Sequence, residues 1–78
     1  DKPLYEIAGF QLLARLFANG KEPNDRGINE FLDQAAVALQ GDNMGVKHAA
    51  ANAVMRFCDF GEDFENIARG ALKGIFEI

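Results

Sequence analysis

Four stretches of this 78-residue chain carry apolar residues three and four positions apart, and short segments rich in Gly, Pro, Asn and Asp separate them. This spacing places the apolar side chains on one face of an α-helix, whereas a strand needs strict alternation. The sequence therefore predicts four helices and no sheet. Connections of about four to seven residues favour antiparallel neighbours, so the expected fold class is all-α, a compact four-helix array that resembles an antiparallel bundle with short loops.

The length of the chain bounds its organisation. Domains usually contain about 100–150 residues, so residues 1–78 are expected to form a single helical domain. A chain this short buries only about 60% of its extended surface on folding. Some apolar side chains are therefore expected to remain exposed or to be covered by a partner.

The first helix is expected to begin near Pro3 and to end at Asn19 and Gly20. Pro is favoured in the first turn of a helix, and Gly is favoured in the left-handed position that follows one. The apolar face of this helix is wide. Its residues are Leu4, Ile7, Ala8, Leu12 and Leu16, with Phe10, Leu13 and Phe17 on the widened part.

The other three helices follow the same pattern. The second is expected to begin at a cap formed by Asn24 or Asp25 and to bury Ile28, Phe31, Leu32, Ala35, Ala36 or Val37, and Leu39. The third, rich in alanine, is expected from Met44 to Cys58 and to bury Val46, Ala49, Ala50, Ala53, Val54, Phe57 and Cys58. The fourth is expected to begin at Glu62 or Asp63 and to bury Phe64, Ile67, Ala68, Ala71, Leu72 and Ile75.

Two glycines recur four positions apart in the last of these stretches. Gly70 and Gly74 each cost about 1 kcal/mol relative to Ala inside a helix, so a packing reason for them is expected. Small residues let two helix backbones approach closely. We therefore expect both glycines to face the alanine-rich third helix.

The residues that the chain lacks limit its chemistry. It contains no Ser, Thr or Trp, and it has one Cys (Cys58) and one His (His48). A Ser or Thr nucleophile is therefore excluded, and no second ligand accompanies His48 at metal-binding spacing. We expect a protein that is not an enzyme, with no catalytic residue, no metal and no cofactor. His48 is expected on an exposed flank and Cys58 as an inert buried thiol. The lone Cys favours a reducing compartment, the cytoplasm.

The charge of the chain limits its partners. Twelve acidic residues against eight basic ones give a net charge of −4. Nucleic-acid binding needs a basic surface, and no polybasic patch or long apolar run is present for a membrane. Neither a nucleic acid nor a membrane is expected as a partner. A helix-turn-helix DNA-binding protein remains an alternative, because Arg26, Lys47, Arg56 and Arg69 lie on short helices.

Four carboxylates cluster where the third and fourth helices are expected to meet. They belong to Asp59, Glu62, Asp63 and Glu65. The simplest interpretation is a solvated corner in which acidic residues complement the dipole of the following helix. A docking patch for a basic protein is a second interpretation. A third is a small-molecule or divalent-metal-binding domain, in which Asp59, Glu62 and Asp63 are ligands or phenylalanines line a cavity.

Seven phenylalanines are many for a chain of this size. Phe10, Phe17 and Phe76 lie towards the edges of their faces or near a terminus, so we expect them to be exposed and to form the surface of a homodimer. No motif is specific enough to indicate a family. The expected function is that of a non-enzymatic, acidic, helical protein–protein interaction module, a small regulator or adaptor that associates with itself.

Overall fold

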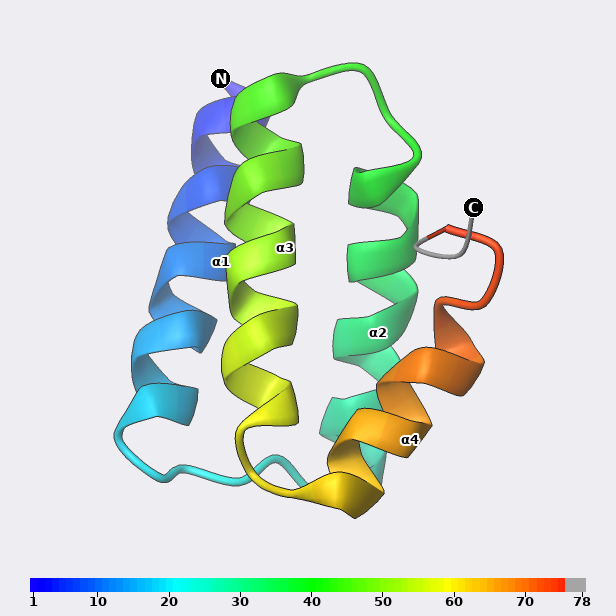
Figure 1. Ribbon diagram of the computed structural model, residues 1–78. Coiled ribbons are helices and arrows are strands. Elements are labelled where there is room, and N and C mark those ends of the chain that lie inside the picture. The colour runs from blue at the N-terminus through cyan, green and yellow to red at the C-terminus, as the bar shows by residue number, and fades with distance from the viewer. Residues whose placement is uncertain (76–78) are drawn as a thin grey trace.

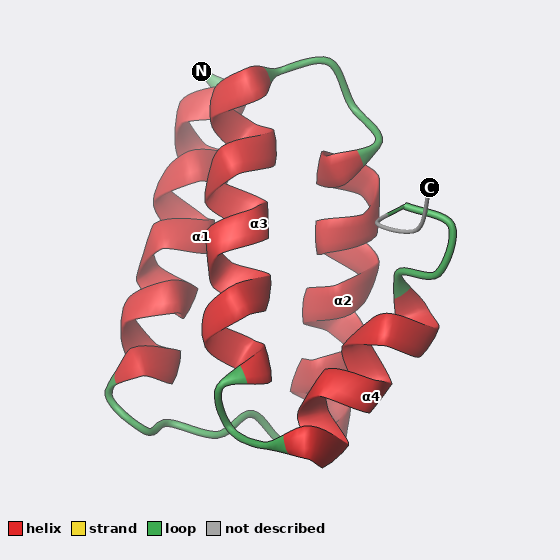
Figure 2. Cartoon of the chain, viewed as in Figure 1, coloured by secondary structure: helices red, strands yellow, loops and turns green. Residues whose placement is uncertain are grey.

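The computed structural model describes residues 1–75, which form four helices (Figure 1). They are α1 (Lys2–Ala18), α2 (Asp25–Leu39), α3 (Met44–Cys58) and α4 (Glu62–Ala71), joined by short loops (Figure 2). These residues contain no strand, so the predicted all-α four-helix array is confirmed. Consecutive helices run in opposite directions, and α1 and α3 therefore point the same way (Figure 1).

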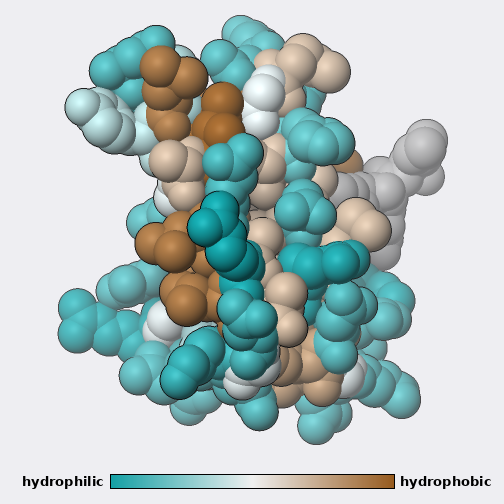
Figure 3. Space-filling model, turned by 90° about the vertical axis from the view of Figure 1, so that its left-hand side faces the viewer, coloured by the Kyte–Doolittle hydropathy of each residue, from teal (hydrophilic) through white to brown (hydrophobic). Residues whose placement is uncertain are grey.

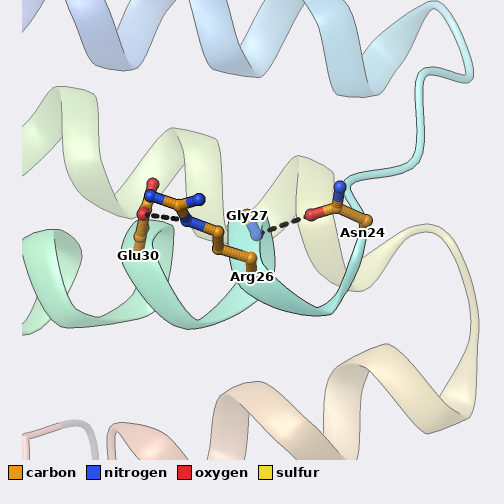
Figure 4. Close-up of polar contacts among 4 residues, drawn as sticks. All are labelled: Asn24, Arg26, Gly27 and Glu30. Carbon is orange, nitrogen blue, oxygen red and sulfur yellow. Dashed lines mark hydrogen bonds and ion pairs between the residues drawn. The ribbon is translucent and has the colours of Figure 1, made fainter.

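Asparagine side chains fix the starts of α2 and α3. Asn24 Oδ1 accepts a hydrogen bond of 2.8 Å from the backbone N–H of Gly27 (Figure 4). Asn43 Oδ1 accepts one of 2.9 Å from the backbone N–H of Val46. Both bonds satisfy N–H groups that have no partner within the helix. Of the two predicted caps of α2, Asn24 is therefore the correct one.

A glycine ends α1 as predicted. Gly20 has a φ of +86°, a conformation that other residues adopt only at a cost. Its N–H donates to the Phe17 carbonyl, and the Lys21 N–H donates to the Leu16 carbonyl at 3.0 Å. This pair of bonds is the Schellman motif, which satisfies the last carbonyls of a helix.

The alanine-rich helix α3 lies in the centre of the fold. It contacts each of the other three helices, and its most extensive contact is with α1. Small residues allow this approach, since a Cβ placed on Gly45 would lie 3.0 Å from Cδ1 of Ile7. The closest neighbour of α1 is thus its parallel partner α3, and not the antiparallel helix α2 that follows it in sequence.

The expectation that Gly70 and Gly74 face α3 is wrong. Gly70 is exposed, and a Cβ placed there would meet no atom within 4 Å. Gly74 lies beyond the end of α4 with a φ of +88°, and a Cβ there would also meet nothing. The first glycine leaves open space on the surface, and the second supplies a left-handed turn. The spacing of four resembled a packing motif because the sequence does not show that α4 ends at Ala71.

Phenylalanine rings join all four helices in one cluster. Its members are Phe10, Phe17, Phe31, Phe57, Phe60 and Phe64. The Phe17 ring is central, with centroid distances of 5.2 Å to Phe31, 5.9 Å to Phe57 and 5.8 Å to Phe60. Edge-to-face pairs of this kind add about 0.5–1.5 kcal/mol beyond the area they bury. Phe10, Phe17, Phe31 and Phe57 are buried in this cluster, and Phe60 and Phe64 are half-buried beside them.

This cluster overturns the expected orientation of α1. Phe10 and Phe17 are each only 5% exposed, so the expectation that they are surface rings is wrong. Leu4 and Leu12 are instead 63% and 55% exposed. The apolar residues of α1 surround the helix, and either side qualified as its buried face. The side that carries the rings became the buried one, because aromatic side chains bury the largest areas and find aromatic partners there.

The predicted cores of the other helices agree more closely with the structure. The predicted residues of α3 are buried, except that Cys58 is half-buried. In α2, Val37 is 71% exposed, so Ala36 is the correct member of the predicted pair. In α4, Ala68 is buried and Ile67 is exposed.

Candidate interaction surface

A groove of about 810 Å³ lies between α1 and α2. Six of its lining residues come from α1, and they are Lys2, Tyr5, Glu6, Gly9, Phe10 and Leu13. The remaining three come from α2, and they are Asp33, Gln34 and Val37. No other element lines it, so the groove is a property of this one helix pair.

The groove exists because the backbones of α1 and α2 stay apart. Both helices lie wholly within the described residues, and no Cα atom of one approaches within 8 Å of the other. The ring of Phe10 reaches across to Phe31, with 6.4 Å between the centroids. Gly9 adds space on the α1 wall, because a Cβ placed there would meet no atom within 4 Å. Large side chains therefore close the interior side of the gap and leave its outer side open.

Apolar side chains of α1 also remain on the surface beside the groove. We call Tyr5, Leu12 and Leu16 the α1 ridge; they are 77%, 55% and 38% exposed. Their spacing of seven and four residues places them on one side of the helix. Figure 3 views the molecule from the α1 side and shows apolar side chains exposed among hydrophilic ones. The ridge and the groove share Tyr5, so together they form one continuous apolar surface, the α1–α2 face.

Two carboxylates stand on facing walls of the groove. Glu6 projects from α1 and Asp33 from α2, and Lys2 is the only cation among the lining residues. Within residues 1–75, neither Glu6 nor Asp33 belongs to an ion pair. The polar groups of the groove are therefore available to charges brought by another molecule.

The carboxylates predicted as an interaction site lie elsewhere. Asp59 lies in the turn from α3 into α4, and Glu62, Asp63 and Glu65 lie at the start of α4, at the end of the molecule opposite the N-terminus (Figure 1). Asp59 Oδ2 lies 3.4 Å from Arg56 Nε, and Glu65 Oε1 accepts a hydrogen bond of 2.8 Å from Arg69 Nη2. Glu62 and Asp63 occupy the first turn of α4, where acidic residues are favourable. This segment has the features of the solvated corner.

The residues predicted for a dimer surface do not come together on the outside. Phe10 forms part of the groove wall but is nearly covered, and Phe17 is buried in the cluster. Phe76 lies outside the described residues. Sequence reasoning missed Tyr5, Leu12 and Val37 as exposed apolar residues. The available signal was that α1 has apolar residues on every side. A helix that buries only one face leaves some of them exposed.

The single thiol and the single imidazole lie apart from the groove. Burial raises the pKa of the Cys58 thiol, and the carboxylates of Glu65 and Asp59 raise it further. His48 is exposed on α3. Among the residues that the structure describes, no group of three or more His, Cys, Asp or Glu side chains is placed to hold a metal ion.

None of the helices in residues 1–75 combines the length and the apolar character that crossing a membrane requires. Comparison with protein-family models, with curated proteins and with solved structures gives no match to this chain.

Proposed function

We propose that this chain is a non-enzymatic helical protein–protein interaction module, a small regulator or adaptor that binds its partner through the α1–α2 face. The observation that supports the proposal is the double-sided apolar character of α1. One side fills the core with Phe10 and Phe17, and the other exposes Tyr5, Leu12 and Leu16. Contiguous exposed apolar side chains rimmed by polar ones are typical of a protein-binding surface.

The energetics of this surface favour an interaction. Covering an exposed Leu side chain completely contributes about 1.5–3 kcal/mol. Leu12 and Leu16 are only partly exposed, and each would contribute less than that, but Tyr5 and Val37 add to the same surface. Binding must also offset about 4–15 kcal/mol of lost translational and rotational freedom, so a complex needs the whole α1–α2 face and not a few of its side chains.

A second candidate function is the binding of a small apolar molecule. The groove volume of about 810 Å³ lies within the range of about 300–1,000 Å³ typical of ligand pockets. Such pockets cover most of their ligand, however, and Tyr5 and Val37 on the two walls are themselves 77% and 71% exposed. An open groove between two helices is better suited to a protein segment.

DNA binding receives little support. Three of the four arginines, Arg26, Arg56 and Arg69, each lie beside a carboxylate of their own helix or turn. The pair between Arg26 and Glu30 is drawn in Figure 4, with 3.0 Å between Nε and Oε1. Paired arginines present little net positive charge to a phosphate backbone.

Sedimentation equilibrium and NMR titration test the proposed function. The predicted homodimer is tested first, because this test needs no other molecule. If the protein sediments with a mass near twice 8.5 kDa, the mass of the Leu12→Glu variant should fall to the monomer value. If the chain is monomeric, a designed amphipathic helix with uncharged flanks should shift the amide resonances of α1 and α2. A monomer whose α1 and α2 resonances do not respond contradicts the proposal.

A further inference from the structure

We infer that the groove between α1 and α2 receives an amphipathic helix of a partner protein, with Lys or Arg residues flanking its apolar stripe. The inference rests on the proposed function and adds the shape and charge of the partner.

The α1 wall of the groove is long enough to lie along a partner helix. The lining residues run from Lys2 to Leu13 on α1, about 17 Å or three helical turns, and from Asp33 to Val37 on α2, about one turn. On the α1 wall, Tyr5, Gly9 and Leu13 form a row spaced by four residues. Rows of this spacing provide the ridges and grooves into which another helix packs. An apolar groove of this form suits the apolar face of an amphipathic helix.

Gly9 forms a notch in the middle of that row. A glycine inside a helix costs about 1 kcal/mol relative to Ala. No contact within the fold requires a glycine here, because a Cβ at Gly9 would meet no atom within 4 Å. Gly45 differs, since its lack of a side chain lets Ile7 approach. The open space at Gly9 lies between Tyr5 and Leu13 on the α1 wall, where an apolar side chain of a partner helix would pack.

The charges on the walls select a basic helix. Glu6 and Asp33 stand on opposite walls, and within residues 1–75 neither has an ion-pair partner. A helix lying between them would place its two polar flanks beside these carboxylates. Cations on both flanks would form ion pairs that the free protein lacks. The net charge of −4 also attracts a basic partner and accelerates its association.

A second copy of the chain fits these charges less well. It would bring the same net charge of −4, and at the groove one cation, Lys2, with the two carboxylates of Glu6 and Asp33. Like charges placed together across an interface oppose association. A foreign basic helix covers the same apolar surface without this repulsion.

The experiment compares two designed helices of about 18 residues, a length that matches α1. Both carry the same stripe of Leu residues, and the flanks are Lys in one peptide and Glu in the other. Fluorescence anisotropy should show that the Lys-flanked peptide binds at least about tenfold more tightly at low salt, and that the difference shrinks near 0.5 M NaCl. Equal binding of the two peptides overturns the inference and leaves the proposed function standing.

Charge-neutralising variants locate the effect. Glu6→Gln with Asp33→Asn should weaken binding of the Lys-flanked peptide about tenfold and leave the Glu-flanked peptide unaffected or slightly tighter. Glu62→Gln with Asp63→Asn on α4 changes the net charge by the same amount and is the matched control. If both double variants weaken binding equally, the effect is overall charge and not the groove, and the inference fails.

A groove-filling variant tests the notch without loss of folding. Gly9→Leu improves helix propensity and its Cβ would meet no atom within 4 Å, so the variant should fold, and its side chain should occupy the groove and exclude the peptide. Gly70→Leu on the exposed face of α4 is the control and should bind normally. Full binding by Gly9→Leu places the peptide elsewhere and overturns the inference.

Two further outcomes separate the inference from the proposed function. If the protein is a homodimer that excludes both peptides and dissociates in Gly9→Leu, a second copy occupies the groove; this overturns the inference but supports the proposed function. Failure of both peptides to bind a monomeric protein contradicts both.

Discussion

The rings of Phe17 and Phe31 meet edge to face with their centroids 5.2 Å apart, although they come from two helices whose Cα atoms nowhere lie within 8 Å. Both helices belong wholly to the described residues. Long aromatic side chains therefore hold α1 and α2 together while their backbones remain apart. Phe31 also contacts Phe10, with 6.4 Å between the ring centroids, and Phe10 lines the groove.

Replacing a ring of this cluster should cost much more stability than removing an exposed apolar side chain. Phe31→Ala should lower the free energy of unfolding by about 3–5 kcal/mol, because it removes buried aromatic area and leaves a cavity. Leu12→Ala should change it by less than about 0.5 kcal/mol, because the side chain is mostly in water. Urea denaturation followed by circular dichroism measures both. Similar losses in the two variants would show that the ridge is part of the core.

Two glycines of parallel helices should respond differently to alanine. Gly9→Ala should raise the free energy of unfolding by about 1 kcal/mol, since alanine favours the helix and its Cβ meets nothing. Gly45→Ala should gain less, because its Cβ would lie 3.0 Å from Cδ1 of Ile7 and 3.3 Å from Oδ1 of Asn43. The difference between the two midpoints in urea is the measurement. An equal gain would mean that α1 moves away from α3 without cost.

The glycines near the C-terminal end of α4 should give changes of opposite sign. Gly70→Ala should stabilise the protein by about 1 kcal/mol through helix propensity. Gly74→Ala should destabilise it by about 1 kcal/mol, because its φ of +88° is strained for a residue with a Cβ. Thermal unfolding of the two variants provides the comparison. A stabilised Gly74→Ala protein would show that this turn has no part in the fold.

The Cys58 thiol should react slowly with iodoacetamide near neutral pH. Its pKa is raised first by burial and then by the negative charges of Glu65 and Asp59, so little thiolate is present. Glu65→Gln should lower this pKa and increase the rate of reaction, and the urea-unfolded chain is the control for a fully accessible thiol. Rapid modification of the native protein would contradict the assigned surroundings.

The raised pKa of Cys58 also determines how the free energy of unfolding changes with pH. Because folding raises the pKa, the folded protein holds the thiol proton more tightly than the unfolded chain. The stabilising contribution is complete below the ordinary thiol pKa and declines as the pH rises through the raised value. Substituting Cys58 by Ala should remove this alkaline decline. If the variant loses stability at alkaline pH as the native protein does, other titratable groups cause the loss.

The sequence predicts most of the helix boundaries because short-range chemistry sets them. Gly20 allows a left-handed turn and Asn43 offers a cap oxygen, and both effects act within a few residues. The bounds of α3 are those predicted. Gly74 shows the limit of such reasoning, because a glycine near the end of an apolar pattern fits both a helix interior and the left-handed turn that it forms after α4.

The candidate site was not predictable in the same way. Choosing between Phe10 and Leu12 as the buried side of α1 requires knowing which other helix carries a matching ring, and Phe31 supplies it from a distant part of the chain. The groove depends on the separation of two helix backbones, which no periodicity encodes. Glu6 and Asp33 lie in different helices, and only the fold places them on facing walls.

The parallel packing of α1 against α3 has a consequence for the order of biosynthesis. α1 emerges from the ribosome before α3, the helix against which it packs most closely, and the whole of α2 is made in between. At about 5–20 residues per second, synthesis of the segment from Ala18 to Cys58 takes about 2–8 s. During this interval α1 has apolar side chains on every side and no α3 to cover them. A nascent chain in which α1 has emerged and α3 has not is therefore open to chaperone binding or misassociation at α1.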